Sequence, residues 1–267
     1  MRDISLGQFV AGNSIVHKLD PRTKISIMIL YIVMTFLVKR IFFFAIPFAF
    51  LMMGLLLSHI SLKYIGKSLK PIRVLLIFMY LINLIFNGGD TVLWDLGFWK
   101  LTLEAILQSC FMTLRIVLLV AGASMLTLTT SPIALTDGIE KLLTPLKVFR
   151  FPAHELAMMM TIALRFIPTL LDESDKIKNA QMARGADFES GNIFRRVKSM
   201  IPILIPLFVS SFRKADELAT AMESRCYHGG EGRTRMHQLK FTLADFYAML
   251  ITFAFLAVLI VLLVVFK

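Results

Sequence analysis

The chain has 267 residues, of which 57% are hydrophobic, and it carries a formal net charge of +11. Its mean hydropathy of +0.74 lies far above that of soluble domains, which excludes a soluble enzyme and indicates a polytopic helical membrane protein. The basic excess is therefore expected on cytoplasmic loops, beside anionic membrane lipid or acidic protein partners, and no nucleic-acid partner is expected.

Five apolar runs predict about five transmembrane spans. They occupy residues 25–38, 41–58, 74–87, 102–129 and 243–266. The first two are short for a span of about 20 residues, so they form either two tilted helices or one re-entrant pair. Before the first run, Asp20 is a candidate N-cap and Pro21 a candidate first helical residue.

The distribution of charge around the third run predicts the orientation of the chain. Residues 59–73 contain three lysines and an arginine, whereas residues 88–101 contain two aspartates and a single lysine. Because basic residues concentrate on the cytoplasmic side, residues 88–101 are expected outside and the N-terminus inside. Five spans then place the C-terminus outside.

The fourth run contains Arg115 near its middle. A cation at this depth is costly, so we expect it to face a protein interior, and a structural pair with a carboxylate is favoured over a direct role in transport. Further along the same run, residues 121–124 read Ala-Gly-Ala-Ser, and such small side chains allow helices to approach closely.

Two long helical patterns follow the fourth run. Ser131 and Pro132 first begin a short amphipathic helix over 132–147, expected to lie on the membrane. Longer patterns then extend over about 152–185 and 192–228, each apolar in its first half and charged in its second. Prolines at 168, 202 and 206 should kink them. The predicted organisation is an N-terminal transmembrane part (1–131), a part with two long helices (132–240) and a C-terminal transmembrane helix (241–267).

The charged halves of these helices carry one pattern twice. It reads Asp-x-(Ile/Leu)-x-x-Ala-x-x-x-Arg, and its copies end at Arg184 and Arg225. At helical spacing each arginine shares a face with a small residue, Ala180 or Ala221, which permits close packing. Because a guanidinium can make paired hydrogen bonds to a carboxylate, such an end suits insertion into an acidic groove. Alternatively, both arginines cap solvated helix ends.

The motifs Ala183-Arg184-Gly185 and Ser224-Arg225-Cys226 resemble the two X-Arg-X signature motifs of the T component of energy-coupling factor transporters, the EcfT and CbiQ family. Two further segments resemble the same family, in consistent order over most of the chain. They are Leu19-Asp20-Pro21-Arg22-Thr23-Lys24, and Thr130-Ser131-Pro132 followed by Gly138-Ile139-Glu140-Lys141-Leu142-Leu143. Cys226 stands where the family often has glycine.

The resemblance implies an all-α membrane scaffold in an ATP-driven importer of a vitamin or metal ion, in the plasma membrane of a prokaryote. The two long helices would be cytoplasmic coupling helices, and Arg184 and Arg225 would each enter a groove of one of two ATPase subunits. These subunits would bind ATP and magnesium, so this chain would hold no cofactor. A separate membrane-embedded S component would bind the substrate.

Two other classes of function stay open from the residues alone. An integral membrane enzyme acting on lipid or prenyl substrates would centre on Asp172, Glu173 and Asp175. A self-contained secondary transporter needs inverted repeats, and none is found by inspection. The chain has no phosphate-binding loop and its five histidines are scattered, so neither ATP hydrolysis nor a metal site is expected.

Overall fold

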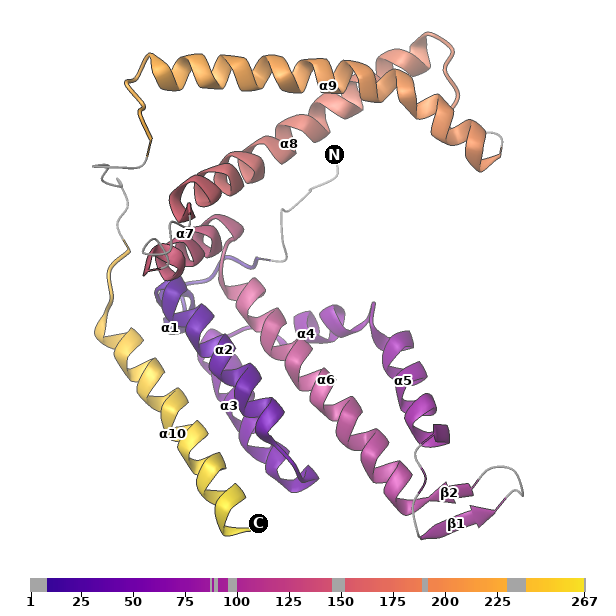
Figure 1. Cartoon of the computed structure of the whole chain (residues 1–267), viewed down its shortest axis with the longest axis vertical. Coiled ribbons are helices and arrows are strands. Elements are labelled where there is room, and N and C mark those ends of the chain that lie inside the picture. Colours follow the sequence, from indigo (N-terminus) through magenta and orange to yellow (C-terminus); the bar gives the residue numbers. More distant parts are fainter. Residues whose placement is uncertain are drawn as a thin grey trace. The chain divides into compact units, whose positions relative to one another are not determined.

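The computed structural model describes residues 9–86, 88, 91–95, 100–145, 152–188, 192–229 and 239–266, which fold into two compact units. The larger unit comprises Ser5–Leu142 and Gln238–Lys267. The second, which we term the helix-pair unit, comprises Leu143–His237 with Met1–Ile4. The two units are described separately (Figure 1).

In its described residues the larger unit is helical except for one short antiparallel hairpin. Its helices are α1 (Ile15–Lys18), α2 (Pro21–Leu37), the 3-10 helix η1 (Ile41–Phe44), α3 (Ala45–Ser58), α4 (Leu62–Leu69), α5 (Arg73–Phe86), α6 (Leu103–Thr129), α7 (Pro132–Leu143) and α10 (Leu243–Val265). The hairpin pairs β1 (Val92–Asp95) with β2 (Lys100–Thr102), where the sequence predicted only a loop. The predicted all-α class is confirmed.

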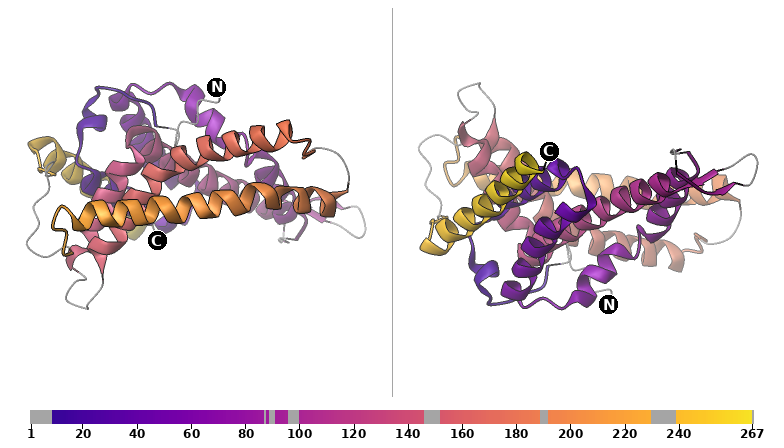
Figure 2. Two further views of the ribbon diagram at one scale, coloured as in Figure 1. Left: turned by 90° about the horizontal axis from the view of Figure 1, so that it is seen from above. Right: turned by 90° about the horizontal axis from the view of Figure 1, so that it is seen from below.

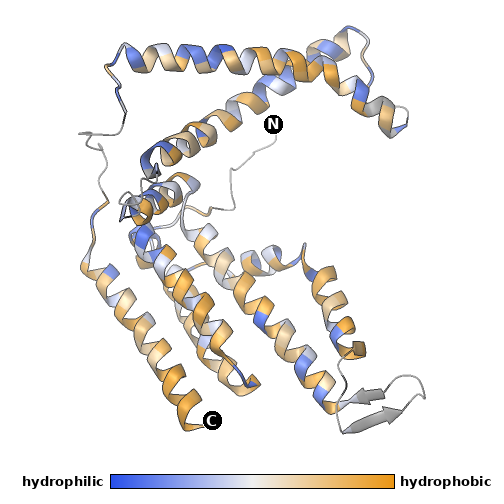
Figure 3. Ribbon diagram, in the orientation of Figure 1, coloured by the Kyte–Doolittle hydropathy of each residue, from blue (hydrophilic) through white to orange (hydrophobic). Residues whose placement is uncertain are grey.

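The predicted number of about five spans agrees with the helices that are long and apolar enough to cross a membrane, but the predicted run at 25–38 is not among them. Among the described residues four qualify, namely Ile41–Ser58, α6, α10 and His154–Ala183, the last of which was predicted to lie on the cytoplasmic side. The pair of α4 and α5, bent by 64°, adds a fifth if it counts as one span. With 17 residues, α2 is about 26 Å long, slightly less than the hydrocarbon thickness of about 30 Å. Figure 3 shows mainly apolar residues along α10, whereas the C-terminal half of the long helix α9 (Ile193–Glu223) mixes hydrophilic and apolar residues.

The predicted helix starts are confirmed by side-chain hydrogen bonds. The carboxylate of Asp20 accepts from the backbone N–H of Arg22, with Pro21 as the first residue of α2. The hydroxyl of Ser131 accepts from the N–H of Ala134 at the start of α7. Both are N-caps that satisfy otherwise unpaired helix donors.

Close packing between α2 and α6 forms the centre of the larger unit. A Cβ atom at Gly122 would lie 2.4 Å from the Tyr31 ring, and the Tyr31 hydroxyl donates to the carbonyl of Leu118 at 3.1 Å. The predicted role of the small-residue patch is therefore confirmed. The buried core is completed by residues of α2, α3, α6 and α10 and of the segments between them, including Met34, Val38, Phe44, Leu51, Leu55, Ala121, Leu128 and Leu259.

Arg115 binds the end of α2, not a carboxylate. Its terminal nitrogen donates to the carbonyl of Val38 at 2.9 Å, and its guanidinium lies 4.6 Å from the ring centre of Phe111 and 5.7 Å from that of Phe36. A cation here complements the negative end of the α2 dipole and the negative faces of two aromatic rings. The interior position is confirmed, and the expected carboxylate partner is wrong.

A carboxylate at the start of α10 holds the segment that precedes α2. Asp245 accepts from the backbone N–H of Asp20 at 2.8 Å and from the N–H and hydroxyl of Thr242 at 2.8 and 2.7 Å. Arg22 pairs with Asp20 at 3.2 Å and donates to the carbonyl of Leu239 at 3.0 Å. The segment Leu19–Lys24 thus connects the first and last long helices of the unit.

Candidate functional site: two arginine-bearing helix ends

The helix-pair unit contains two long helices of equal length. α8 spans Ala153–Ala183 and α9 spans Ile193–Glu223, and each continues through its internal prolines. The two helices run in opposite directions and cross, so that their C-terminal ends lie at opposite ends of the pair (Figures 1 and 2). The two X-Arg-X motifs are therefore far apart and directed away from each other.

The crossing joins two residues that occupy the same place in the repeat. Lys214 of α9 binds Glu173 of α8 at 3.3 Å, and the two are 41 residues apart, which is also the offset between Arg184 and Arg225. Each arginine follows its crossing residue by 11 positions, about 16 Å along a helix. The pair therefore has an approximate two-fold symmetry, with an arginine at each equivalent end.

The first end closes in a Schellman motif. The N–H of Gly185 donates to the carbonyl of Met182 at 3.0 Å, and the N–H of Ala186 donates to that of Gln181 at 3.0 Å. Gly185 adopts a left-handed backbone with φ of +88°. Glycine takes this conformation without the steric cost of a Cβ atom.

The second end has the same geometry without glycine. The N–H of Cys226 donates to the carbonyl of Glu223 at 2.8 Å, and the N–H of Tyr227 donates to that of Met222 at 3.0 Å. Cys226 has φ of +57°, so it occupies the left-handed position that Gly185 holds in the first motif. The two motifs thus present Arg184 and Arg225 from equivalent helix ends.

Neither arginine uses its guanidinium to close its own helix. The last carbonyls are bound by backbone N–H groups, and within the described part of the chain neither guanidinium makes a hydrogen bond or an ion pair. All six motif residues are exposed. Because the caps are made by the backbone, hydrogen bonding by the arginine side chains is not needed to close either helix.

The faces that lead to the two arginines are equivalent and open. Ala180 and Ala221 are both exposed, and the neighbouring Ile177 and Leu218 are half-buried. The surfaces around Ala180 and Ala221, where close packing is predicted, are therefore accessible to a partner. No residue of the described chain covers either alanine fully.

The acidic residues considered for an enzyme site have different surroundings. Asp172 and Asp175 are exposed, whereas Glu173 is half-buried and pairs with Lys214. Glu173 is thus part of the helix crossing, a structural role that the sequence did not reveal. The 41-residue offset was the signal that could have indicated it, since residues 173 and 214 carry opposite charges at equivalent positions.

Comparison with known proteins identifies relatives over most of the chain. The model of the family described as "Cobalt transport protein" (CbiQ) matches residues 12–237. The energy-coupling factor transporter transmembrane protein EcfT of Thermosediminibacter oceani is 53% identical over 252 residues, covering 94% of this chain and 95% of the relative. The proteins of the same name from Lactococcus lactis and Bacillus subtilis are 45% and 44% identical over 245 residues, covering 92% of each chain.

Proposed function

This chain belongs to the CbiQ and EcfT family of energy-coupling factor transporter transmembrane proteins, and from this membership we propose how its two arginine-bearing ends act. It is a non-catalytic, multi-pass membrane component of such a transporter. Each X-Arg-X end docks into an acidic groove on one of two ATPase subunits. The ATPases bind ATP and magnesium, and their movement is transmitted through α8 and α9.

The observation that carries this proposal is the equivalence of the two ends. Arg184 and Arg225 are exposed, free of described partners and placed after the same backbone cap at opposite ends of an approximately two-fold pair. Two equivalent surfaces related in this way suit two copies of similar partners. A guanidinium that is not engaged within its own chain is available for a bidentate bond to a carboxylate.

A further component, the S component that binds a vitamin or metal ion, rests on the apolar parts of the helix pair. α9 exposes a large set of apolar side chains before its charged half, namely Phe194, Val197, Met200, Ile201, Leu204, Ile205, Phe208, Val209 and Phe212. An exposed surface that carries this many large apolar side chains supports a contact with a protein or a membrane. Movement of α9 would then be transmitted directly to the S component.

The orientation follows from charge. The basic segment 59–73 and the charged ends of α8 and α9 face the cytoplasm of a prokaryotic cell, as does the N-terminus. By length and composition alone α8 could also span a membrane. Its second half carries Asp172, Glu173 and Asp175, which favours a position outside the bilayer core.

The test is association of the chain with its ATPases after removal of each guanidinium. We expect Arg184→Ala or Arg225→Ala to weaken copurification and uptake at least tenfold, because each removes a charge-assisted pair of about 1.5–3 kcal/mol. The double variant should lose both ATPases. Matched controls are Lys176→Ala on α8 and Arg213→Ala on α9, exposed basic residues outside the motifs, which should leave association unchanged. A double variant that still copurifies with both ATPases and transports normally rules the proposal out.

A further inference from the structure

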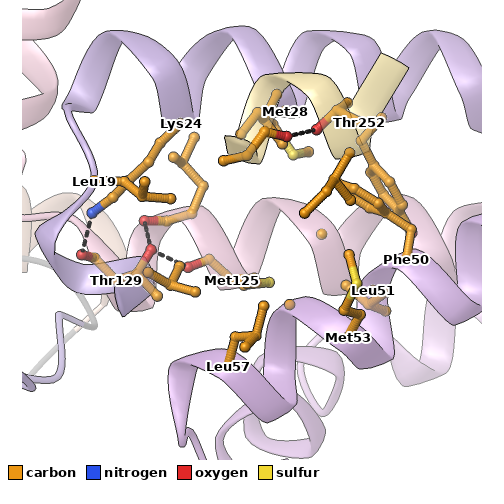
Figure 4. A pocket seen from close by; sticks show the side chains of 18 of the residues that line it. Leu19, Lys24, Met28, Phe50, Leu51, Met53, Leu57, Met125, Thr129 and Thr252 are labelled. Carbon is orange, nitrogen blue, oxygen red and sulfur yellow. Dashed lines mark hydrogen bonds between the residues drawn. The ribbon is translucent and has the colours of Figure 1, made fainter. Parts of the chain in front are cut away.

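A cavity of about 340 Å³ lies within the larger unit, between α2, α3, α6 and α10 (Figure 4). Its walls are mainly apolar, and they include Met28, Phe50, Leu51, Leu57 and Met125. In liquid water a space of this size would hold about ten molecules. The cavity is therefore large enough for part of an elongated molecule.

The hydroxyl protons deep in this wall are already donated to backbone carbonyls. The hydroxyl of Tyr31 donates to the Leu118 carbonyl, that of Thr129 to the Met125 carbonyl at 2.9 Å, and that of Thr252 to the Ala248 carbonyl at 2.8 Å. Apolar cavities whose polar groups are already satisfied remain dry and bind apolar molecules. The interior of the cavity thus suits a hydrocarbon chain.

Lys24 gives the cavity one charged end. Its side chain lines the cavity, although the residue is only 7% exposed. Its ammonium donates to the carbonyls of His17 and Thr129, both at 3.0 Å. An ammonium has three N–H donors, so one donor is left over.

No carboxylate of the described chain neutralises this ammonium by direct contact. The carboxylates of Asp245 and Asp20 interact electrostatically with this ammonium, although Asp245 accepts its hydrogen bonds from Asp20 and Thr242, and Asp20 pairs with Arg22. Neither forms an ion pair with Lys24 within 4.0 Å. A buried cation without a direct counter-ion is costly, and an anion placed beside it offsets that cost.

We propose that this cavity binds one anionic membrane phospholipid, with an acyl chain in the apolar interior and the phosphate at Lys24. The position of the cavity favours a lipid over a soluble anion. Lys24 lies in the first turn of α2, beside the start of α10, so the charged end is at the end of the helices and the apolar interior extends along them. This matches the order of headgroup and chain in a bilayer. The proposal does not depend on the ATPase partners.

The experiment measures lipid binding by native mass spectrometry of the full chain in mild detergent. Phosphatidylglycerol and phosphatidylcholine of the same chain length are titrated, and free sn-glycerol 3-phosphate is added as a competitor. We expect phosphatidylglycerol to bind about tenfold more tightly, because a charge-assisted bond to Lys24 adds about 1.5 kcal/mol. Glycerol phosphate at millimolar concentration should not compete.

Two variants separate the charged end from the apolar interior. Lys24→Gln should abolish the preference for phosphatidylglycerol, whereas Lys18→Gln, an exposed lysine six residues earlier, should preserve it. Ala248→Phe places a ring into the cavity wall and should weaken binding of both lipids. Lys24 also donates to two backbone carbonyls, so its removal could affect folding as well as charge. Lys24→Arg retains the charge and should keep the preference for phosphatidylglycerol. For each variant, a single symmetric size-exclusion peak checks folding.

Three results would overturn the proposal. Equal binding of the two lipids by the unaltered chain would show that the charge of Lys24 does not select an anionic lipid. Displacement of the lipid by glycerol phosphate would identify the ligand as a small soluble anion. Unchanged lipid binding by a folded Ala248→Phe chain would place the lipid outside the cavity.

Discussion

Cys226 adopts a backbone conformation that is unfavourable for its residue type. Gly185 and Cys226 hold equivalent left-handed positions, at φ of +88° and +57°. For a residue with a Cβ atom this conformation costs about 1–2 kcal/mol. The second motif therefore maintains the geometry of the first against a steric cost.

Substitution at these two positions should change local opening in opposite directions. We expect Cys226→Gly to slow hydrogen exchange of the Tyr227 amide about fivefold, because removing the steric cost raises the free energy of local opening by about 1 kcal/mol. Gly185→Ala should accelerate exchange of the Ala186 amide by a similar factor, because it lowers that free energy by about the same amount. Cys226→Ala is the matched control and should leave exchange unchanged, because alanine also has a Cβ atom. Faster exchange in Cys226→Gly would show that the cysteine side chain stabilises this end.

How far single residues could be predicted depended on how local their interactions are. The N-caps Asp20 and Ser131 were predicted because each bonds a backbone N–H two or three residues later. The partner of Arg115 could not be predicted, because the Val38 carbonyl lies 77 residues earlier in the chain and every helix end leaves such carbonyls free. The doubled arginine motif was visible, but the left-handed backbone of Cys226 was not, because the residue type disfavours it.

At the scale of elements, hydropathy predicted most of the helices and little of their contacts. The apolar runs at 41–58, 102–129 and 243–266 agree with η1 and α3, α6 and α10 to within a residue or two. Helix α4 and the hairpin of β1 and β2 were missed, because short elements carry too few residues for a periodic signal. The repeat predicted two similar helix ends, but their opposite direction follows from tertiary packing.

The ion pair between Glu173 and Lys214 should keep the two helices in register at their crossing. Its side chains are 30% and 24% exposed, so we expect it to contribute less than about 1 kcal/mol. Glu173→Lys places two ammonium groups at the crossing and should broaden the distance distribution between spin labels at residues 183 and 224, measured by pulsed electron paramagnetic resonance. The charge-swapped double variant Glu173→Lys with Lys214→Glu should narrow it again.

The neighbouring Asp172→Lys provides the control for this measurement. Asp172 is exposed and outside the crossing pair, so the distribution should not change. Equal broadening by Asp172→Lys and Glu173→Lys would show a general effect of charge on α8. Failure of the swapped variant to restore the distribution would show that the ion pair does not set the register.

At the scale of the whole molecule, the chain divides into a membrane scaffold and a helix pair with two equivalent ends. The larger unit contains the polar connection between α2 and α10 and the cavity beside it, and the helix-pair unit contains both arginine motifs. The organisation predicted from the sequence, with parts at 1–131, 132–240 and 241–267, stays a prediction. The identity of the transported substrate is not encoded in the chain if a separate S component selects it, as proposed above.

The proposed docking of ATPases on both helix ends can be tested directly by protection of a thiol at each end. The native Cys226 is exposed beside Arg225, and Ala183→Cys in a chain with Cys110→Ser and Cys226→Ser provides the matching probe beside Arg184. In inside-out vesicles, both thiols should react with a membrane-impermeant maleimide when the ATPases are absent, and each should react at least tenfold more slowly when they are bound. Equal labelling of both thiols with and without bound ATPases would contradict the proposal that these helix ends are the docking sites.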